Sequence, residues 1–212
     1  MSRPTKAFSE YGVCACFLRI LPPLVFALGT GCQPFHPRDP IRIPEIAEES
    51  ARTVDFPMPQ IQIEMAAQDS LEQSLEIFDA DLPRAGIYAV WVRIRNDSAH
   101  ALNLDSSHIY LTRQGVGYAQ LIPPDQIMEL LYKSYRTRIY SPFFRAQLEN
   151  WFEEMRLKHT GVPSGQERSG YLFFRMNSKE YGLLKGARLR WSDIKSANSP
   201  ELLEIDYTFP GP

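Results

Sequence analysis

Short runs of alternating apolar and polar residues occupy the chain from about residue 60 onward. In the first run, Ile61, Ile63 and Met65 alternate with polar neighbours, which is typical of a strand with one buried face. The other runs with strand character are residues 87–96, 102–104, 107–113, 118–122, 170–176, 187–191 and 202–209. Turn-forming residues separate the runs and no strand–helix–strand alternation occurs, so a parallel sheet is not expected. The pattern predicts a mainly β fold, an antiparallel immunoglobulin-like β-sandwich within residues 60–212.

The run at residues 87–96 (IYAVWVRIRN) carries the clearest strand signal in the chain. Side chains alternate between the two faces of a strand, so its apolar positions from Tyr88 to Ile94 share one face. Trp91, Arg93 and Arg95 share the other face. We expect the first face to lie in the core.

Residues 123–160 break the strand pattern with helical periodicity. A first helix begins near Pro124, and a second is predicted from residue 142 to residue 158, after Ser141 as N-cap. The apolar positions of the second helix recur at helical spacing and are Phe144, Leu148, Trp151, Phe152 and Met155. The sequence therefore predicts an α-helical insertion, at about residues 123–160, in the β domain.

The first 31 residues read as a targeting segment. Positive charge at Arg3, Lys6 and Arg19 precedes nine apolar residues at 20–28, and small residues follow, which is the pattern of a signal peptide. Nine residues rise only about 14 Å as a helix, too little to span a bilayer. The alternatives are a signal peptide with an incidental cysteine after it, or an uncleaved N-terminal helix.

The sequence GTGC at residues 29–32 resembles the lipobox of bacterial lipoproteins, although Gly29 stands where that family has an aliphatic residue. The resemblance implies cleavage before Cys32 and attachment of lipid to Cys32. Cys14 and Cys16 would leave with the signal peptide, and no other cysteine follows Cys32. By the same resemblance, Gln33 after the cysteine favours the outer membrane over the inner one. We expect a lipid-anchored domain in the periplasm or at the cell surface.

Residues 32–59 are rich in proline and include an acidic patch at Glu45, Glu48 and Glu49. Proline at this density predicts an extended tether between the lipid and the domain. The alternative is that part of the segment docks on the domain as an edge strand or a short helix.

Charge and composition argue against nucleic acid as a partner. The whole chain holds 23 basic and 25 acidic residues, and residues 1–31 contain three of the basic residues and one of the acidic residues. The remainder has 20 basic and 24 acidic residues, so its net charge is −4. Nucleic-acid-binding domains usually carry a basic surplus instead.

Motifs of catalysis are missing from the sequence. The four histidines are His36, His100, His108 and His159, and their spacing matches no zinc motif. The chain also has no nucleophile elbow, no phosphate-binding loop and no dinucleotide-binding motif. We therefore expect no enzyme activity, no metal and no cofactor.

The strongest candidate for recognition is an aromatic and basic stretch inside the helical insertion. Its candidate interface residues are Tyr132, Tyr135, Arg136, Arg138, Tyr140 and Phe143. Tyrosine and arginine dominate binding hot spots, so the stretch predicts contact with an envelope protein. Alternatively, these side chains fix the insertion to the β domain. A different class of function, a carrier of small ligands or lipids, would require a cavity lined by Phe143, Phe144, Trp151 and Phe152.

Residues 60–209 resemble bacterial immunoglobulin-like lipoproteins. The segments that carry the resemblance, besides GTGC, are VWVRIRND, HIYLTRQGVGYAQLIPP and VPSGQERSGYLFF. The resemblance implies a fold and a compartment but no reaction. Together with the missing catalytic motifs, it predicts a lipid-anchored, non-catalytic envelope lipoprotein that acts as a protein-interaction or structural module.

Overall fold

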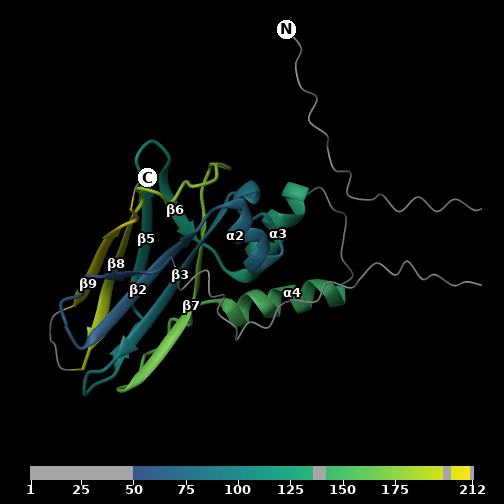
Figure 1. Ribbon diagram of the computed structural model, residues 1–212. Helices are drawn as coiled ribbons and strands as arrows, with labels where there is room; N and C mark the ends of the chain where they lie inside the picture. Colours follow the sequence, from purple (N-terminus) through teal and green to yellow (C-terminus); the bar gives the residue numbers. More distant parts are fainter. Residues whose placement is uncertain (1–49, 136–141, 198–201, 211–212) are drawn as a thin grey trace, which may run out of the picture. The chain divides into compact units, whose positions relative to one another are not determined.

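The computed structural model of the chain describes residues 50–135, 142–197 and 202–210 (Figure 1). The strands are β1 (Arg52–Val54), β2 (Ile61–Gln68), β3 (Ile87–Asn96), β4 (Leu102–Asn103), β5 (His108–Arg113), β6 (Gly117–Leu121), β7 (Gln166–Arg175), β8 (Arg188–Ser196) and β9 (Leu203–Thr208). The helices are α2 (Leu71–Phe78), α3 (Pro124–Tyr135) and α4 (Pro142–Met155), with a 3₁₀ turn η1 (Pro83–Ala85). The expected mainly β class is confirmed, and α3 and α4 form a helical insertion between β6 and β7.

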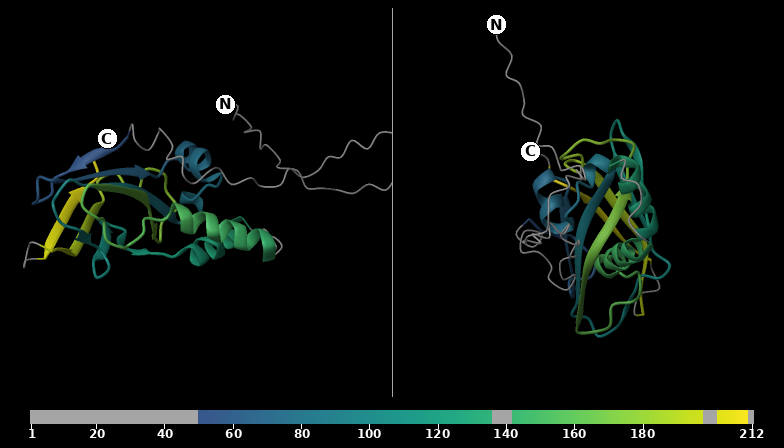
Figure 2. Two further views of the ribbon diagram at one scale, coloured as in Figure 1. Left: turned by 90° about the horizontal axis from the view of Figure 1, so that it is seen from below. Right: turned by 90° about the vertical axis from the view of Figure 1, so that its right-hand side faces the viewer.

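The nine strands form one antiparallel sheet that is nearly closed like a barrel. Its hydrogen-bonded path runs β1-β2-β3-β7-β6-β5-β8, and both β4 and β9 pair with β8. The longest pairing joins β3 to β7, from Ile87 opposite Arg175 to Asn96 opposite Gln166. Figures 1 and 2 show the three helices gathered beside β3 and β7, with β8 and β9 on the far side of the sheet.

The inside of the barrel is a continuous apolar core. Alternate residues of β3 point into it, and Tyr88, Val90, Val92 and Ile94 are fully buried there. Strands β2, β5, β7, β8 and β9 contribute further apolar side chains to the same core, among them Trp191. The predicted core face of residues 87–96 is therefore correct.

A second core lies between the outer face of the sheet and the helices. Phe78 of α2 contacts Phe173 of β7 at a ring-centroid distance of 5.7 Å and Trp151 of α4 at 6.4 Å. Phe152 of α4 also packs on Phe173, at 5.6 Å. Trp91, on the outer face of β3, is fully buried. Both faces of β3 are thus buried at Trp91, because helices cover this half of the sheet.

Helix α2 was not expected from the sequence. It begins with a capping box, in which the Ser70 side chain accepts a hydrogen bond from the Gln73 backbone N–H at 3.1 Å. The Gln73 side chain in turn accepts from the backbone N–H of Ser70. Its buried residues Ser74, Ile77 and Phe78 face the sheet.

The chain between α4 and β7 runs along the sheet as a strap. The backbone N–H of Leu157 donates to the carbonyl of Tyr171 at 2.9 Å, and Val162 exchanges two backbone hydrogen bonds with Leu102. A Cβ atom on Gly170 would lie 2.6 Å from the Leu157 nitrogen, so only glycine admits the strap at this point. This strap explains why α4 ends at Met155, three residues before the predicted end.

Strand β1 lies within the segment expected to be a tether. Arg52 pairs with Met65 and Val54 pairs with Ile63, so residues 52–54 form an edge strand on β2. Residues 52–54 therefore dock on the domain as an edge strand, which is the alternative to an extended tether for this part of the segment.

A buried carboxylate joins the end of β2 to the loop before β8. An oxygen of Asp69 accepts a hydrogen bond from the Leu184 backbone N–H at 2.6 Å, and the Asp69 carbonyl accepts from Gly182. Burial raises the pKa of Asp69 above its usual value, although the Leu184 hydrogen bond acts in the opposite direction. The folded state therefore binds the Asp69 proton more tightly than the unfolded chain does, and the charged form at neutral pH lowers stability.

We predict that Asp69→Asn raises the free energy of unfolding at pH 7, because the amide removes the buried charge and keeps an oxygen for Leu184. The gain should shrink as the pH falls toward the usual pKa of aspartate, where the wild-type carboxylate is protonated in the folded state. Urea unfolding of both proteins between pH 4 and pH 7 measures this. The exposed Asp55→Asn serves as the control. A gain that grows toward low pH would contradict the prediction.

Candidate functional site

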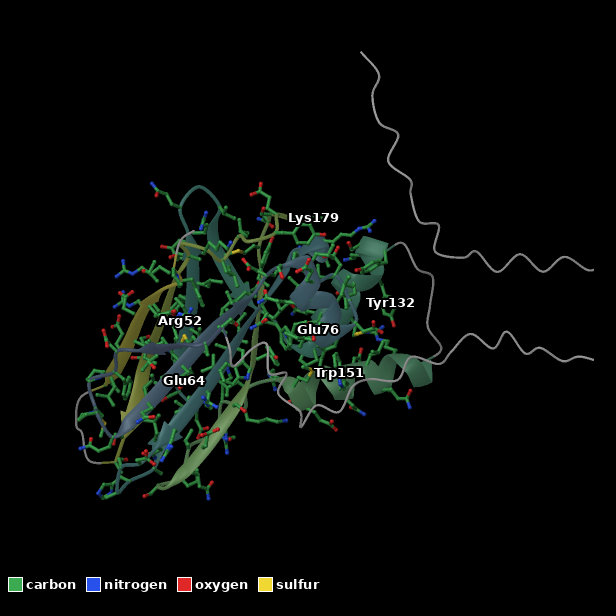
Figure 3. The ribbon with its side chains drawn as sticks, viewed as in Figure 1. Arg52, Glu64, Glu76, Tyr132, Trp151 and Lys179 are labelled. Carbon is green, nitrogen blue, oxygen red and sulfur yellow. The ribbon has the colours of Figure 1, made fainter. Side chains whose placement is uncertain are left out.

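The candidate interface lies at the end of α3 and the start of α4. Tyr132 and Tyr135 belong to the last turn of α3, and Figure 3 shows Tyr132 there. Arg136, Arg138 and Tyr140 lie outside the described residues. Phe143 lies in α4, but its side chain is also outside what the structure describes. Of the candidate interface residues, the structure therefore describes the side chains of Tyr132 and Tyr135 alone.

Tyr135 attaches α3 to the turn before β3. Its hydroxyl accepts a hydrogen bond from the Asp81 backbone N–H at 2.8 Å. The guanidinium carbon of Arg84 lies 5.4 Å from the centre of the Tyr135 ring, which is a cation–π contact. The side chain keeps 37% of its surface exposed. These contacts support the alternative that Tyr135 fixes the helical insertion to the β domain.

Asp81 connects three separate segments at this corner. One of its carboxylate oxygens accepts from the Tyr181 hydroxyl at 2.7 Å, and the other accepts from the Arg84 backbone N–H at 3.1 Å. The hydrogen bond to Asp81 raises the pKa of Tyr181 to about 12. Helix α3, the η1 turn and the loop after β7 are thus held together through one buried residue, with α3 bound to the Asp81 backbone and the other two segments bound to its carboxylate.

A groove opens beside this corner. It has a volume of about 370 Å³ and lies between the end of η1, α3 and residues 175–179. Three of its side chains are basic: Lys133 of α3, Arg175 at the end of β7, and Lys179, which Figure 3 shows in the following loop. No sequence pattern brings these three residues together.

The outer face of β5, β6 and β8 carries two exposed tyrosines. Tyr118 of β6 is 83% exposed and Tyr110 of β5 is 48% exposed. Tyr118 pairs with Thr112, two positions along β5 from Tyr110, so the two rings are diagonal neighbours on one face. His108 stacks on Tyr110 with ring centroids 6.4 Å apart. Alternation along the strand places His108 and Tyr110 on one face, but the sequence predicts no interface there.

Two arginines flank the tyrosines, and each is paired with a carboxylate of β9. Arg188 donates to Asp206 at 2.6 Å, and Arg190 donates to Glu204 at 2.9 Å. Arg190 lies opposite Tyr110 in the register of β5 and β8. Tyr110, Tyr118, Arg188 and Arg190 together are called the tyrosine face below.

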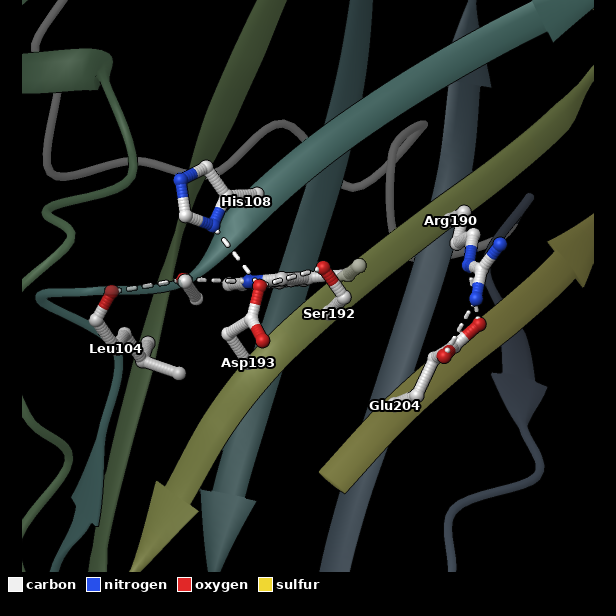
Figure 4. Close-up of polar contacts among 8 residues, drawn as sticks. Leu104, His108, Arg190, Ser192, Asp193 and Glu204 are labelled. Carbon is white, nitrogen blue, oxygen red and sulfur yellow. Dashed lines mark hydrogen bonds and ion pairs between the residues drawn. The ribbon is translucent and has the colours of Figure 1, made fainter. Parts of the chain in front are cut away.

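A histidine, a carboxylate and a serine meet at one end of the tyrosine face (Figure 4). Asp193 is within 2.9 Å of the His108 ring nitrogen, and the Ser192 hydroxyl donates to the same carboxylate oxygen at 2.9 Å. The hydrogen bond from His108 lowers the pKa of Asp193. In a serine nucleophile site the histidine stands between serine and carboxylate. Here the carboxylate stands in the middle instead, at the bulge in β8, where Asp193 has a φ of +62°.

A smaller pocket of about 170 Å³ lies between β6, β7 and the strap, and His159 and Arg156 line it. Burial lowers the pKa of His159, and the charge of Arg156 acts in the same direction. Neither this pocket nor the groove is lined by Trp151 or Phe152, which pack in the second core.

Within the described ranges, no three side chains of histidine, cysteine, aspartate or glutamate gather closely enough to hold a metal ion. In the same residues, no helix has the length and apolar character needed to cross a membrane.

Comparisons with known proteins give no family. No family model matches the chain, and no curated protein matches it. Among solved structures, the chain is similar to a crystal structure described as a conserved hypothetical protein from Bacillus anthracis. The match has 8% sequence identity and a TM-score of 0.28, and it covers 74% of this chain and 97% of that chain.

We predict that Tyr135→Phe lowers the free energy of unfolding by about 1 kcal/mol, the usual loss for one hydrogen bond of this kind. Tyr118→Phe is the matched control and should change nothing, because that side chain is almost wholly exposed. Thermal and urea unfolding measure both variants. If Tyr135→Phe is as stable as the wild type, the packing role of Tyr135 is wrong.

Proposed function

We propose that the chain is a lipid-anchored, non-catalytic envelope lipoprotein that binds a partner protein through its tyrosine face. The observation that carries this proposal is the exposure of Tyr118 and Tyr110, at 83% and 48%, on a strand surface away from the three described helices. Large aromatic side chains are usually covered in a folded domain. Their clustering with Arg188 and Arg190 matches the composition of protein–protein hot spots.

The surrounding charges suit a binding role better than a stabilising one. Ion pairs as exposed as Arg188–Asp206 and Arg190–Glu204 contribute little to folding. They do hold the guanidinium groups in fixed positions beside Tyr110. A side chain that is already ordered loses less conformational entropy when a partner binds.

The anchor and the compartment belong to the same proposal. Lipid on Cys32 would hold the domain to the outer membrane, with the domain in the periplasm or at the cell surface. The net charge of −4 after residue 31 gives the domain no electrostatic attraction to an anionic bilayer, so the lipid would supply the attachment. For the fold, we propose that the barrel-like sheet is an immunoglobulin-like sandwich whose halves are β1-β2-β3-β7 and β6-β5-β8-β9.

We predict that Cys32→Ser abolishes lipid attachment, because the thiol is the acceptor of the diacylglyceryl group. Labelling of cells with a radioactive fatty acid, followed by membrane fractionation, measures the effect. Cys16→Ser is the control and should keep both the label and the membrane fraction. A Cys32→Ser protein that still carries label would overturn the anchor.

The tyrosine face is tested by photo-crosslinking in cells. A photoreactive amino acid at position 118 should form a discrete adduct with one envelope protein. The same amino acid at Leu75, which is exposed on α2, should not form that adduct. Tyr110→Ala should reduce the adduct at position 118 about tenfold or more, since hot-spot truncation costs about 2 kcal/mol.

Tyr110→Ala should leave the melting temperature almost unchanged, because the side chain is half exposed and lies outside both cores. Identical adducts at positions 118 and 75, or an adduct unaffected by Tyr110→Ala, would contradict the proposed surface.

A further inference from the structure

We propose that the groove beside α3 binds a small anionic ligand through Lys133, Arg175 and Lys179. These side chains come from a helix, a strand end and a loop, and they line one space of about 370 Å³. That volume falls within the range of small-molecule sites, which is about 300–1,000 Å³. The site is separate from the tyrosine face and from the anchor, so it is a further function.

The positive charge in the groove is only partly neutralised by the protein. In the described part of the chain, Arg175 and Lys179 make no ion pair with a carboxylate. Lys133 pairs with Glu129 at 2.7 Å. The charge of Arg175 also acts on Glu129, whose pKa is lowered chiefly by its hydrogen bond to Lys133. The lining of the groove thus holds three basic side chains and no acidic one among the described residues, in a chain that is acidic as a whole.

The walls of the groove are fixed by backbone contacts. The Met176 N–H donates to the Gly86 carbonyl at 3.0 Å, and Gly86 has a φ of +76°. A Cβ atom at Gly86 would lie 2.9 Å from the Met176 carbonyl oxygen, so glycine lets the two segments approach this closely. The buried Tyr88 hydroxyl donates to the Ser178 carbonyl at 3.2 Å. A ligand would therefore meet a site whose backbone is already ordered, which reduces the entropic cost of binding.

The chemistry of the lining indicates a hydroxylated anion. The planar guanidinium of Arg175 matches the paired oxygens of a carboxylate or a phosphate, and the lysines act as compact point charges. Asn177 adds an amide to the lining, and Ser134, whose hydroxyl donates to the Arg84 carbonyl, adds an acceptor oxygen. These neutral polar groups suit the hydroxyls of a sugar. The shared chemistry is an anionic group on a sugar-sized molecule, either a sugar phosphate or a uronic acid.

Isothermal titration of the full-length chain, purified in detergent at low salt, tests the proposal with three probes. Glucose 1-phosphate and glucuronate represent the phosphate and the carboxylate source, and glucose is the neutral control. We expect at least one anion to bind and glucose not to bind. The anion that binds more tightly shows whether the ligand carries a phosphate or a carboxylate.

Variants then assign the binding to the groove. Arg175→Gln combined with Lys179→Gln should weaken binding at least about tenfold, because two charge-assisted contacts are lost. Glu129→Gln should strengthen binding severalfold, since it removes the competing carboxylate beside Lys133. Lys195→Gln removes an exposed positive charge from β8, outside the groove, and should leave the affinity unchanged.

The proposal is overturned if neither anion binds at about 10 mM, the weakest affinity of interest for such a site. It is also overturned if Lys195→Gln weakens binding as much as the groove variant, or if Glu129→Gln weakens it. Melting curves of all variants confirm that these exposed substitutions leave the fold intact. None of these outcomes depends on crosslinking at position 118, so the groove and the tyrosine face can fail separately.

Discussion

The pairing of β3 with β7 is the contact on which the rest of the structure depends, because both faces of this pair are buried where the helices cover the sheet. Ten residues of β3 lie opposite ten residues of β7. Tyr88 and its neighbours fill the barrel on one side, and Trp91 and Phe173 face the helices on the other. The covering helices are also close in sequence to the strands they cover, since α2 and α4 are the last helices before β3 and β7. The fold also requires glycine at position 170, because a side chain there would displace the strap between α4 and β7.

Much of this fold is predictable from local patterns. The run at residues 87–96 predicts β3 with its observed bounds, and the proline and periodicity signals predict the starts of α3 and α4. Burial of Trp91 is not predictable in this way, because alternation describes a strand with one buried face and not one covered by helices. Helix α2 does carry a local signal, the capping box of Ser70 and Gln73, which the apolar pattern alone does not reveal.

The candidate sites were harder to predict because their parts are distant in sequence. Tyr135 reads as an interface residue by composition, but its partner Asp81 lies 54 residues away. The exposure of Tyr118 depends on which strand face the helices leave uncovered, and alternation does not specify that. Composition indicates only which kinds of residue are candidates for recognition. Their placement follows from the tertiary structure.

Packing and recognition are often treated as alternatives for an aromatic residue, but here one supports the other. Tyr135 holds the end of α3 against Asp81, and the same turn of α3 presents Lys133 to the groove. The Ser134 hydroxyl adds a hydrogen bond to the Arg84 carbonyl at 3.1 Å, on the same side of the helix end. Loss of these contacts would let the end of α3 move and would change the spacing between Lys133 and the positive charges of β7 and its loop. A residue that never touches a ligand can therefore set the geometry of the site that does.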